Sequence, residues 1–63
     1  MRIKFEALVP YHLKPILITP MRVVWLIQGQ ANAVEVTGIL LAQGHRASYH
    51  LVNNCMFEVE VQS

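Results

Sequence analysis

The stretch that we expect to decide the fold is residues 34–61, VEVTGILLAQGHRASYHLVNNCMFEVEV, in which apolar and polar side chains alternate through three successive runs. Alternation with a period of two is typical of a strand that buries one face. It predicts strands over 34–42, 46–51 and 55–61. Turns at residues 43–44 and 52–54 join them into an antiparallel meander.

The register of the last two strands follows from matching their apolar faces, because opposed residues in a sheet point the same way. A three-residue loop over 52–54 ends on an asparagine, which tolerates the left-handed backbone that such loops need. This loop keeps the apolar and polar faces apart. The cross-strand pairs that it predicts include Leu51 with Cys55, Tyr49 with Phe57 and Arg46 with Glu60.

The turn at residues 43–44 sets Gly38 across from Tyr49, whose ring can cover a strand glycine. A bulge at Gly38 is the alternative. The meander then has one apolar face that needs a cover. Its other face is mixed, because three apolar side chains lie among polar ones: Ile39, Leu41 and Met56.

The N-terminal half is expected to supply that cover. Residues 2–9 alternate like a strand that Pro10 ends. Five apolar residues at 23–27 favour another strand over 21–28. The sequence therefore predicts a mainly β fold, a small five-stranded antiparallel sheet or barrel. The alternative is an α+β fold with one short helix over 20–28 packed on the sheet, because Pro20 and Gly29 suit the two ends of a helix.

Composition limits how this chain hides its apolar surface. The 63 residues predict one domain, 1–63; 54% are hydrophobic, only 14% are charged, and there is one cysteine. Chains this small are marginally stable alone, and no intrachain disulfide is available. We expect a second copy or another protein to cover the surplus. The interrupted apolar run at 15–27 is too short to span a bilayer, and the N-terminus lacks a secretory pattern, so a cytoplasmic location without membrane contact is predicted.

The residue types that carry chemistry do not converge in the predicted register. The histidines of the chain and Cys55 lie on different faces or in turns, so we expect no metal site and no cofactor. Ser48, His50 and Glu58 are the only conceivable catalytic group, and a flat sheet face makes them a solvated patch. The chain is not expected to be an enzyme.

Two functions fit these observations. The favoured one is a non-catalytic β-rich interaction module that self-associates or docks on a protein partner through apolar sheet surface. Its candidate contact residues are Trp25, Ile27, Ile39, Leu41 and Met56. The alternative is a small nucleic-acid-binding barrel that uses Tyr11, Lys14, Arg22 and Arg46, although a net charge of +1 provides no strong electrostatic footprint.

Overall fold

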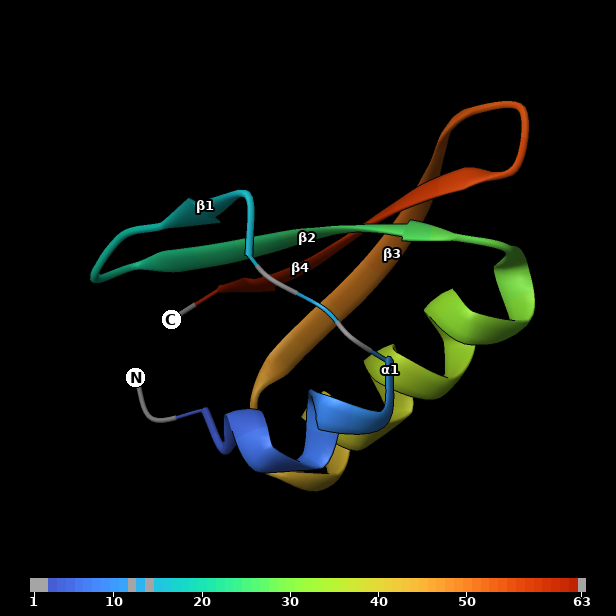
Figure 1. The fold of residues 1–63 in the computed structure, drawn as a ribbon. Helices are drawn as coiled ribbons and strands as arrows, with labels where there is room; N and C mark the ends of the chain where they lie inside the picture. The colour runs from blue at the N-terminus through green and yellow to red at the C-terminus, as the bar shows by residue number, and fades with distance from the viewer. Residues whose placement is uncertain (1–2, 12, 14, 63) are drawn as a thin grey trace.

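The computed structural model describes residues 3–11, 13 and 15–62. A 3₁₀ helix, η1 (Phe5–Tyr11), precedes two strands, β1 (Leu17–Ile18) and β2 (Arg22–Gln28). The helix α1 (Gln30–Ala42) follows, and then the hairpin of β3 (Arg46–Asn53) and β4 (Met56–Gln62). The strands form one antiparallel sheet in the order β1-β2-β4-β3, and α1 and η1 lie on one face of it (Figure 1).

The two central strands, β2 and β4, form the floor of the core. Trp25 lies across from Val59 and Val23 across from Val61, and all four side chains are buried on the face toward α1. Val24 is also buried, although alternation turns it to the opposite face. The predicted strand over 21–28 is therefore confirmed, and the alternative helix over 20–28 is wrong.

The predicted strand over 34–42 is wrong, because these residues belong to α1. Ala33, Val36, Thr37 and Leu40 are buried, which is the i, i+3, i+4, i+7 spacing of a helix face. The alternation that suggested a strand is regular only over Val34–Thr37, where both periods fit the same residues. The segment forms a helix and not a strand because the apolar face of the sheet needs a cover, and Leu40 of the helix is fully buried against it.

The predicted strand over 2–9 is also wrong, although Arg2 lies outside the described residues. Phe5–Tyr11 form η1, and Leu8 reaches the core with 2% of its surface exposed. The last strand also has no free edge for such a strand, because β2 and β3 occupy both edges of β4. The N-terminal segment therefore packs over the sheet and α1.

The hairpin confirms the strands over 46–51 and 55–61, but its register differs by two residues. Leu51 lies across from Phe57 and Tyr49 across from Val59, and a bulge falls between Leu51 and Asn53. A shift of two keeps every side chain on its predicted face. Asn53 pairs with Met56, so the turn is two residues long and the bulge takes up the extra residue. Asn54, in this turn, has the left-handed backbone, with φ 43°.

The fold is thus a small mixed one, with four antiparallel strands and one α-helix. An α+β description holds, whereas the five-stranded sheet or barrel is wrong. Two of its five expected strands are helical segments, which pack on one face of an open sheet.

Candidate interaction surface

The free edge of β3 is the longest exposed backbone in the sheet. β3 is the last strand in the sheet order, and among the described residues no strand lies beyond it. Seven of its eight residues are exposed, and only Ala47 is half-buried. An edge of this kind presents unpaired N–H and C=O groups, which are a template for another strand.

The outward backbone groups of β3 follow from the ladder. Ile16 donates its N–H to the carbonyl of Val24 at 2.7 Å, so the backbone groups of Val24 point toward the β1 side of β2. Backbone direction alternates along a strand, so the residue on either side of Val24 bonds to β4. Carrying this alternation through β4 to β3 turns the backbone of Ser48 and His50 toward β4. The N–H and C=O groups of Ala47, Tyr49 and Leu51 therefore point away from the sheet.

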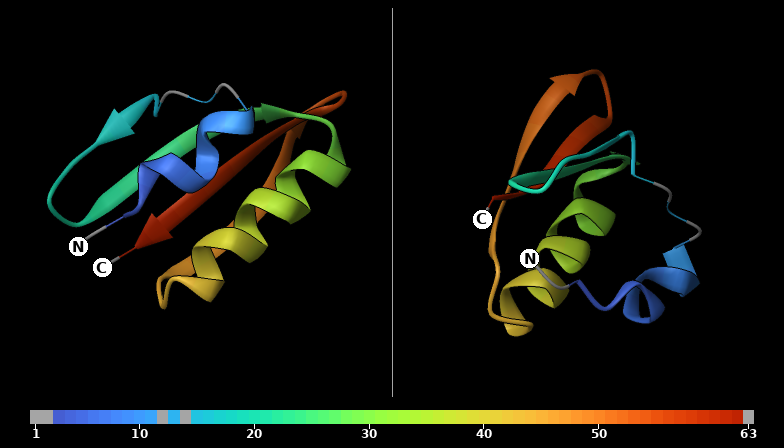
Figure 2. Two further views of the ribbon diagram at one scale, coloured as in Figure 1. Left: turned by 60° about the horizontal axis from the view of Figure 1, so that its bottom comes forward. Right: turned by 90° about the vertical axis from the view of Figure 1, so that its left-hand side faces the viewer.

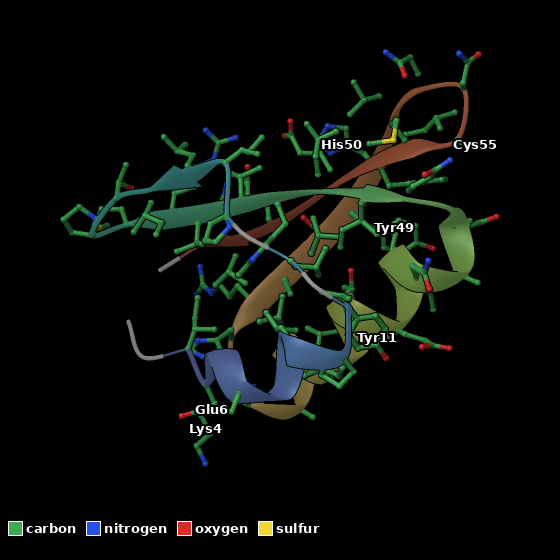
Figure 3. All side chains as sticks on the ribbon, viewed as in Figure 1. Lys4, Glu6, Tyr11, Tyr49, His50 and Cys55 are labelled. Carbon is green, nitrogen blue, oxygen red and sulfur yellow. The ribbon has the colours of Figure 1, made fainter. Side chains whose placement is uncertain are left out.

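Apolar side chains accompany this edge. Tyr49, Leu51 and Val52 have 38%, 57% and 48% of their surfaces exposed. The Tyr49 ring lies against Phe57, with centroids 6.0 Å apart. Figure 3 shows Tyr49 on the α1 side of the sheet and His50 on the other side. The tip of the hairpin extends past α1 (Figure 1), so the helix does not cover these side chains.

The helix adds apolar surface on the same side. Val34 and Leu41 are 45% and 53% exposed, and a Cβ built on Gly38 would meet nothing within 4 Å. These three residues share one side of α1, since they are spaced i, i+4, i+7. Leu41 lines a hollow of about 200 Å³ together with Ala47 and other residues of β3, so this side adjoins the β3 edge.

The opposite side of α1 is covered by η1. Tyr11 donates its hydroxyl to Glu35 at 2.8 Å, and Lys4 and Gln43 exchange two hydrogen bonds at 2.9 and 3.2 Å. Figure 2 shows η1 on one side of α1 and β3 on the other. We call the uncovered side the β3 flank, defined by five exposed apolar residues: Val34, Leu41, Tyr49, Leu51 and Val52.

The other edge of the sheet is partly protected, because β1 pairs with β2 only at Val23 and Val24. β1 is only two residues long, and Pro15 and Pro20 stand near its ends. Short strands and prolines are the usual means by which proteins prevent edge pairing. β3 has neither a proline nor a lysine, and its one bulge is near the turn. The asymmetry marks β3 as the edge that is open to pairing.

The outer face of the sheet, which is the face away from α1, carries an ion-pair network. Arg22 pairs with Glu60 and reaches Glu58 at 4.0 Å, and His50 lies 3.6 Å from Glu58. The hydrogen bond from Arg22 holds the pKa of Glu60 below its ordinary value, against a smaller opposing effect of burial. The expected Arg46–Glu60 pair is wrong, because Arg46 lies across from Gln62 and Arg22 takes its place.

The three residues considered as a catalytic group, Ser48, His50 and Glu58, lie on this face without converging. Ser48 lies across from Glu60, whereas His50 lies across from Glu58. The His50 side chain is 61% exposed, and it does not line the hollow that Ser48 borders. No group of three potential metal ligands occurs within the described part of the chain. The arrangement is that of a solvated polar face.

The predicted contact residues of the interaction module fall into three groups by exposure. Trp25 and Ile27 lie in the core, with 0% and 3% of their surfaces exposed, so neither can touch a partner of the folded chain. Ile39 and Met56 are half-buried. Leu41 is exposed on the β3 flank. The sequence reasoning missed Tyr49 and Leu51 because it assigned them to a covered face.

The residues of the nucleic-acid alternative are not gathered. Arg22 and Arg46 lie on the outer face, on either side of Gln62. Tyr11 belongs to η1 on the opposite side of the sheet, and its hydroxyl is bonded to Glu35. That bond raises the pKa of Tyr11, together with smaller effects of burial and of the Glu35 charge. Lys14 lies outside the described residues.

One further hollow, of about 300 Å³, lies between η1 and β2 and is bordered by Tyr11, Leu26 and Asn32. This volume is at the lower end for ligand pockets. Two of its polar groups already have partners, because Tyr11 bonds to Glu35 and Asn32 donates to the Gln28 carbonyl at 3.1 Å. Few polar groups are left to orient a ligand there.

Comparison with known proteins gave no relative: no family model, no curated protein and no solved structure matches this chain. In the described residues, none of the helices combines the length and apolar character needed to cross a membrane.

Proposed function

We propose that this chain is a non-catalytic interaction module that binds a protein through the β3 flank. The observation that carries the proposal is an eight-residue edge strand with a free backbone and exposed apolar side chains. Exposed apolar surface that is contiguous and adjoins an open strand edge is typical of association sites. Val34 and Leu41 of α1 extend this surface beyond the strand.

Two kinds of contact support binding at this place. The outward N–H and C=O groups of Ala47, Tyr49 and Leu51 can accept an added strand, which is how extended segments bind to sheet edges. Tyr49 and Leu51 of the β3 flank supply apolar area on the α1 side. The outer face contributes polar surface, with Glu58 and Glu60 already paired to Arg22.

Photo-crosslinking in the native cells tests the proposal. A photoreactive phenylalanine at position 51 should give discrete protein adducts, which mass spectrometry identifies. The same residue at position 18 is the control, because Ile18 is 65% exposed on the protected edge. Val34→Lys on the β3 flank should abolish the adducts from position 51. A folded chain that gives no protein adduct from position 51 would contradict the proposal.

A further inference from the structure

We infer that the partner of the β3 flank is a second copy of this chain, bound by antiparallel pairing of the two β3 strands about a twofold axis beside Tyr49. The inference rests on the proposed function, since it names the partner of the same surface. The two four-stranded sheets become one continuous sheet. Both α1 helices then lie on the same side of it, because paired residues in a sheet point the same way.

The hydrogen-bond pattern restricts the position of the axis. Only alternate residues of β3, among them Ala47, Tyr49 and Leu51, direct their backbone groups outward. In a symmetric antiparallel pair, outward residues must oppose outward residues, so the axis passes beside a residue and not between two. Axes beside Ser48, Tyr49 and His50 are the three registers that lie near the middle of the strand.

The axis beside Tyr49 is favoured over the other two. It pairs Ala47 with the partner's Leu51 and uses all residues from 46 to 52. An axis beside Ser48 pairs only residues 46–50 of the strand with one another. An axis beside His50 opposes two histidines directly, which is unfavourable when they are charged, and it would carry the pairing through the bulge to Asn53.

The side chains agree with this register. Two Tyr49 rings meet at the axis on the α1 side, each already packed against Phe57 of its own chain. On the outer face, Ser48 opposes the partner's His50, so a hydroxyl faces an imidazole and no two like charges meet. Val34 and Leu41 of the two helices face each other above the joint, and the open space at Gly38 allows a close approach.

The size of the surface suits a dimer of this kind. β3 has eight residues, which at about 3.3 Å per residue span roughly 26 Å. The longest extent of the molecule is 30 Å, so the strand runs along nearly its whole length. A standard interface takes about 800 Å² from each partner. That is roughly a fifth of the 4306 Å² that the chain exposes, which one long side of the molecule can supply.

Sedimentation equilibrium tests the self-association. The purified chain should have twice its 7.2 kDa mass at high concentration, and Leu51→Lys should return it to the monomer mass. Ile18→Lys is the matched control, because Ile18 is as exposed as Leu51 but lies on the other edge; it should leave the dimer intact. A wild-type chain that stays monomeric at millimolar concentration overturns the inference. The proposed function would still stand if position 51 gave adducts with a different protein.

Disulfide trapping tests the register with residues that are exposed on the outer face. Cys55 is first replaced by serine, since it is the only cysteine, and then Ser48→Cys and His50→Cys are made in separate chains. The axis beside Tyr49 places position 48 across from the partner's position 50 in a non-hydrogen-bonded pair, with Cα atoms about 4.5 Å apart. A disulfide spans Cα separations of about 4.4–6.8 Å.

The two variants should therefore form a mixed disulfide dimer under mild oxidation only when they are combined. Identical positions lie about 8 Å apart on the diagonal in this register, from the strand rise and spacing, so each variant alone should stay uncrosslinked. A dimer from Ser48→Cys alone, or from His50→Cys alone, would place the axis beside that residue. Either result, or no crosslink in any mixture, overturns the register.

Discussion

At the residue scale, the stability of this chain depends on a few fully buried side chains. Leu40 packs from α1 onto the sheet beside Val36 and Val59, and none of the three has exposed surface. Trp25 is equally buried in the centre of β2. A core this small contains few residues, so each contributes a large share of the free energy of unfolding.

Leu40→Ala should therefore lower the free energy of unfolding by about 2–5 kcal/mol, because it removes apolar contacts and leaves a cavity. Urea denaturation followed by Trp25 fluorescence measures the change. Ile18→Ala serves as the comparison, since Ile18 is 65% exposed and its truncation should cost less than about 0.5 kcal/mol. Equal losses for the two variants would show that α1 does not pack as described.

The pair of Arg22 and Glu60 predicts a dependence on pH. The pKa of Glu60 is lowered in the folded chain, chiefly by its hydrogen bond from Arg22. The carboxylate form is thus favoured by folding, and its contribution is present above the ordinary value of 4.5 and lost as the pH falls through the folded pKa. Arg22→Gln should weaken the loss of stability between neutral and acidic pH.

Urea midpoints at pH 7 and pH 3 measure this effect. Arg46→Gln is the matched control, because Arg46 lies on the same face across from Gln62 and should leave the acid dependence as in the wild-type chain. If Arg22→Gln and Arg46→Gln have the same acid dependence as the wild type, the pair does not stabilise the fold.

At the element scale, the sequence predicted the strands far better than the helices. β2 and the hairpin were found because their apolar runs and alternation have no helical interpretation of equal quality. α1 was missed because residues 34–37 alternate, while its buried residues also fit a helical period. The choice between the two depends on what covers the sheet, and local pattern does not contain that information.

The sequence predicted that an apolar interaction surface exists, but it did not predict most of the residues that form it. High apolar content indicated an uncovered surface, and Leu41 was among the expected contacts. Trp25 was also among the expected contacts, whereas the structure buries the tryptophan completely. Tyr49 and Leu51 had the right face, but α1 does not extend over their end of the hairpin. The edge position of β3 came from the order of strands, which no local pattern specifies.

Replacing two glycines, Gly38 and Gly44, by alanine should have opposite effects on the free energy of unfolding. Gly38 lies within α1 with open space around it, so Gly38→Ala should raise the free energy of unfolding by about 0.5–1 kcal/mol. Gly44 ends the helix with φ +89°, so Gly44→Ala should lower it by about 1 kcal/mol or more. Thermal unfolding at low chain concentration, where association contributes little, measures both. A destabilising Gly38→Ala would contradict the assignment of residues 30–42 to a helix.

At the scale of the whole molecule, exposed apolar side chains occur near both edges of the sheet, but only at β3 do they accompany a long free strand edge. The outer sheet face carries an ion-pair network, η1 covers one side of α1, and β1 covers part of the other edge. The β3 flank has none of these features. Its strand edge and its apolar side chains adjoin one another, and pairing with a second copy covers both at once.

Amide hydrogen exchange along β3 tests this account most directly. Ser48 and His50 bond to β4, so their amides should exchange slowly at every protein concentration. The amides of Ala47, Tyr49 and Leu51 point away from the sheet, and in an isolated chain they bond only to water. These three amides should become protected as the protein concentration rises, and Leu51→Lys should remove the protection at Ala47 and Tyr49. Fast exchange at all three, from micromolar to millimolar concentration, would contradict it.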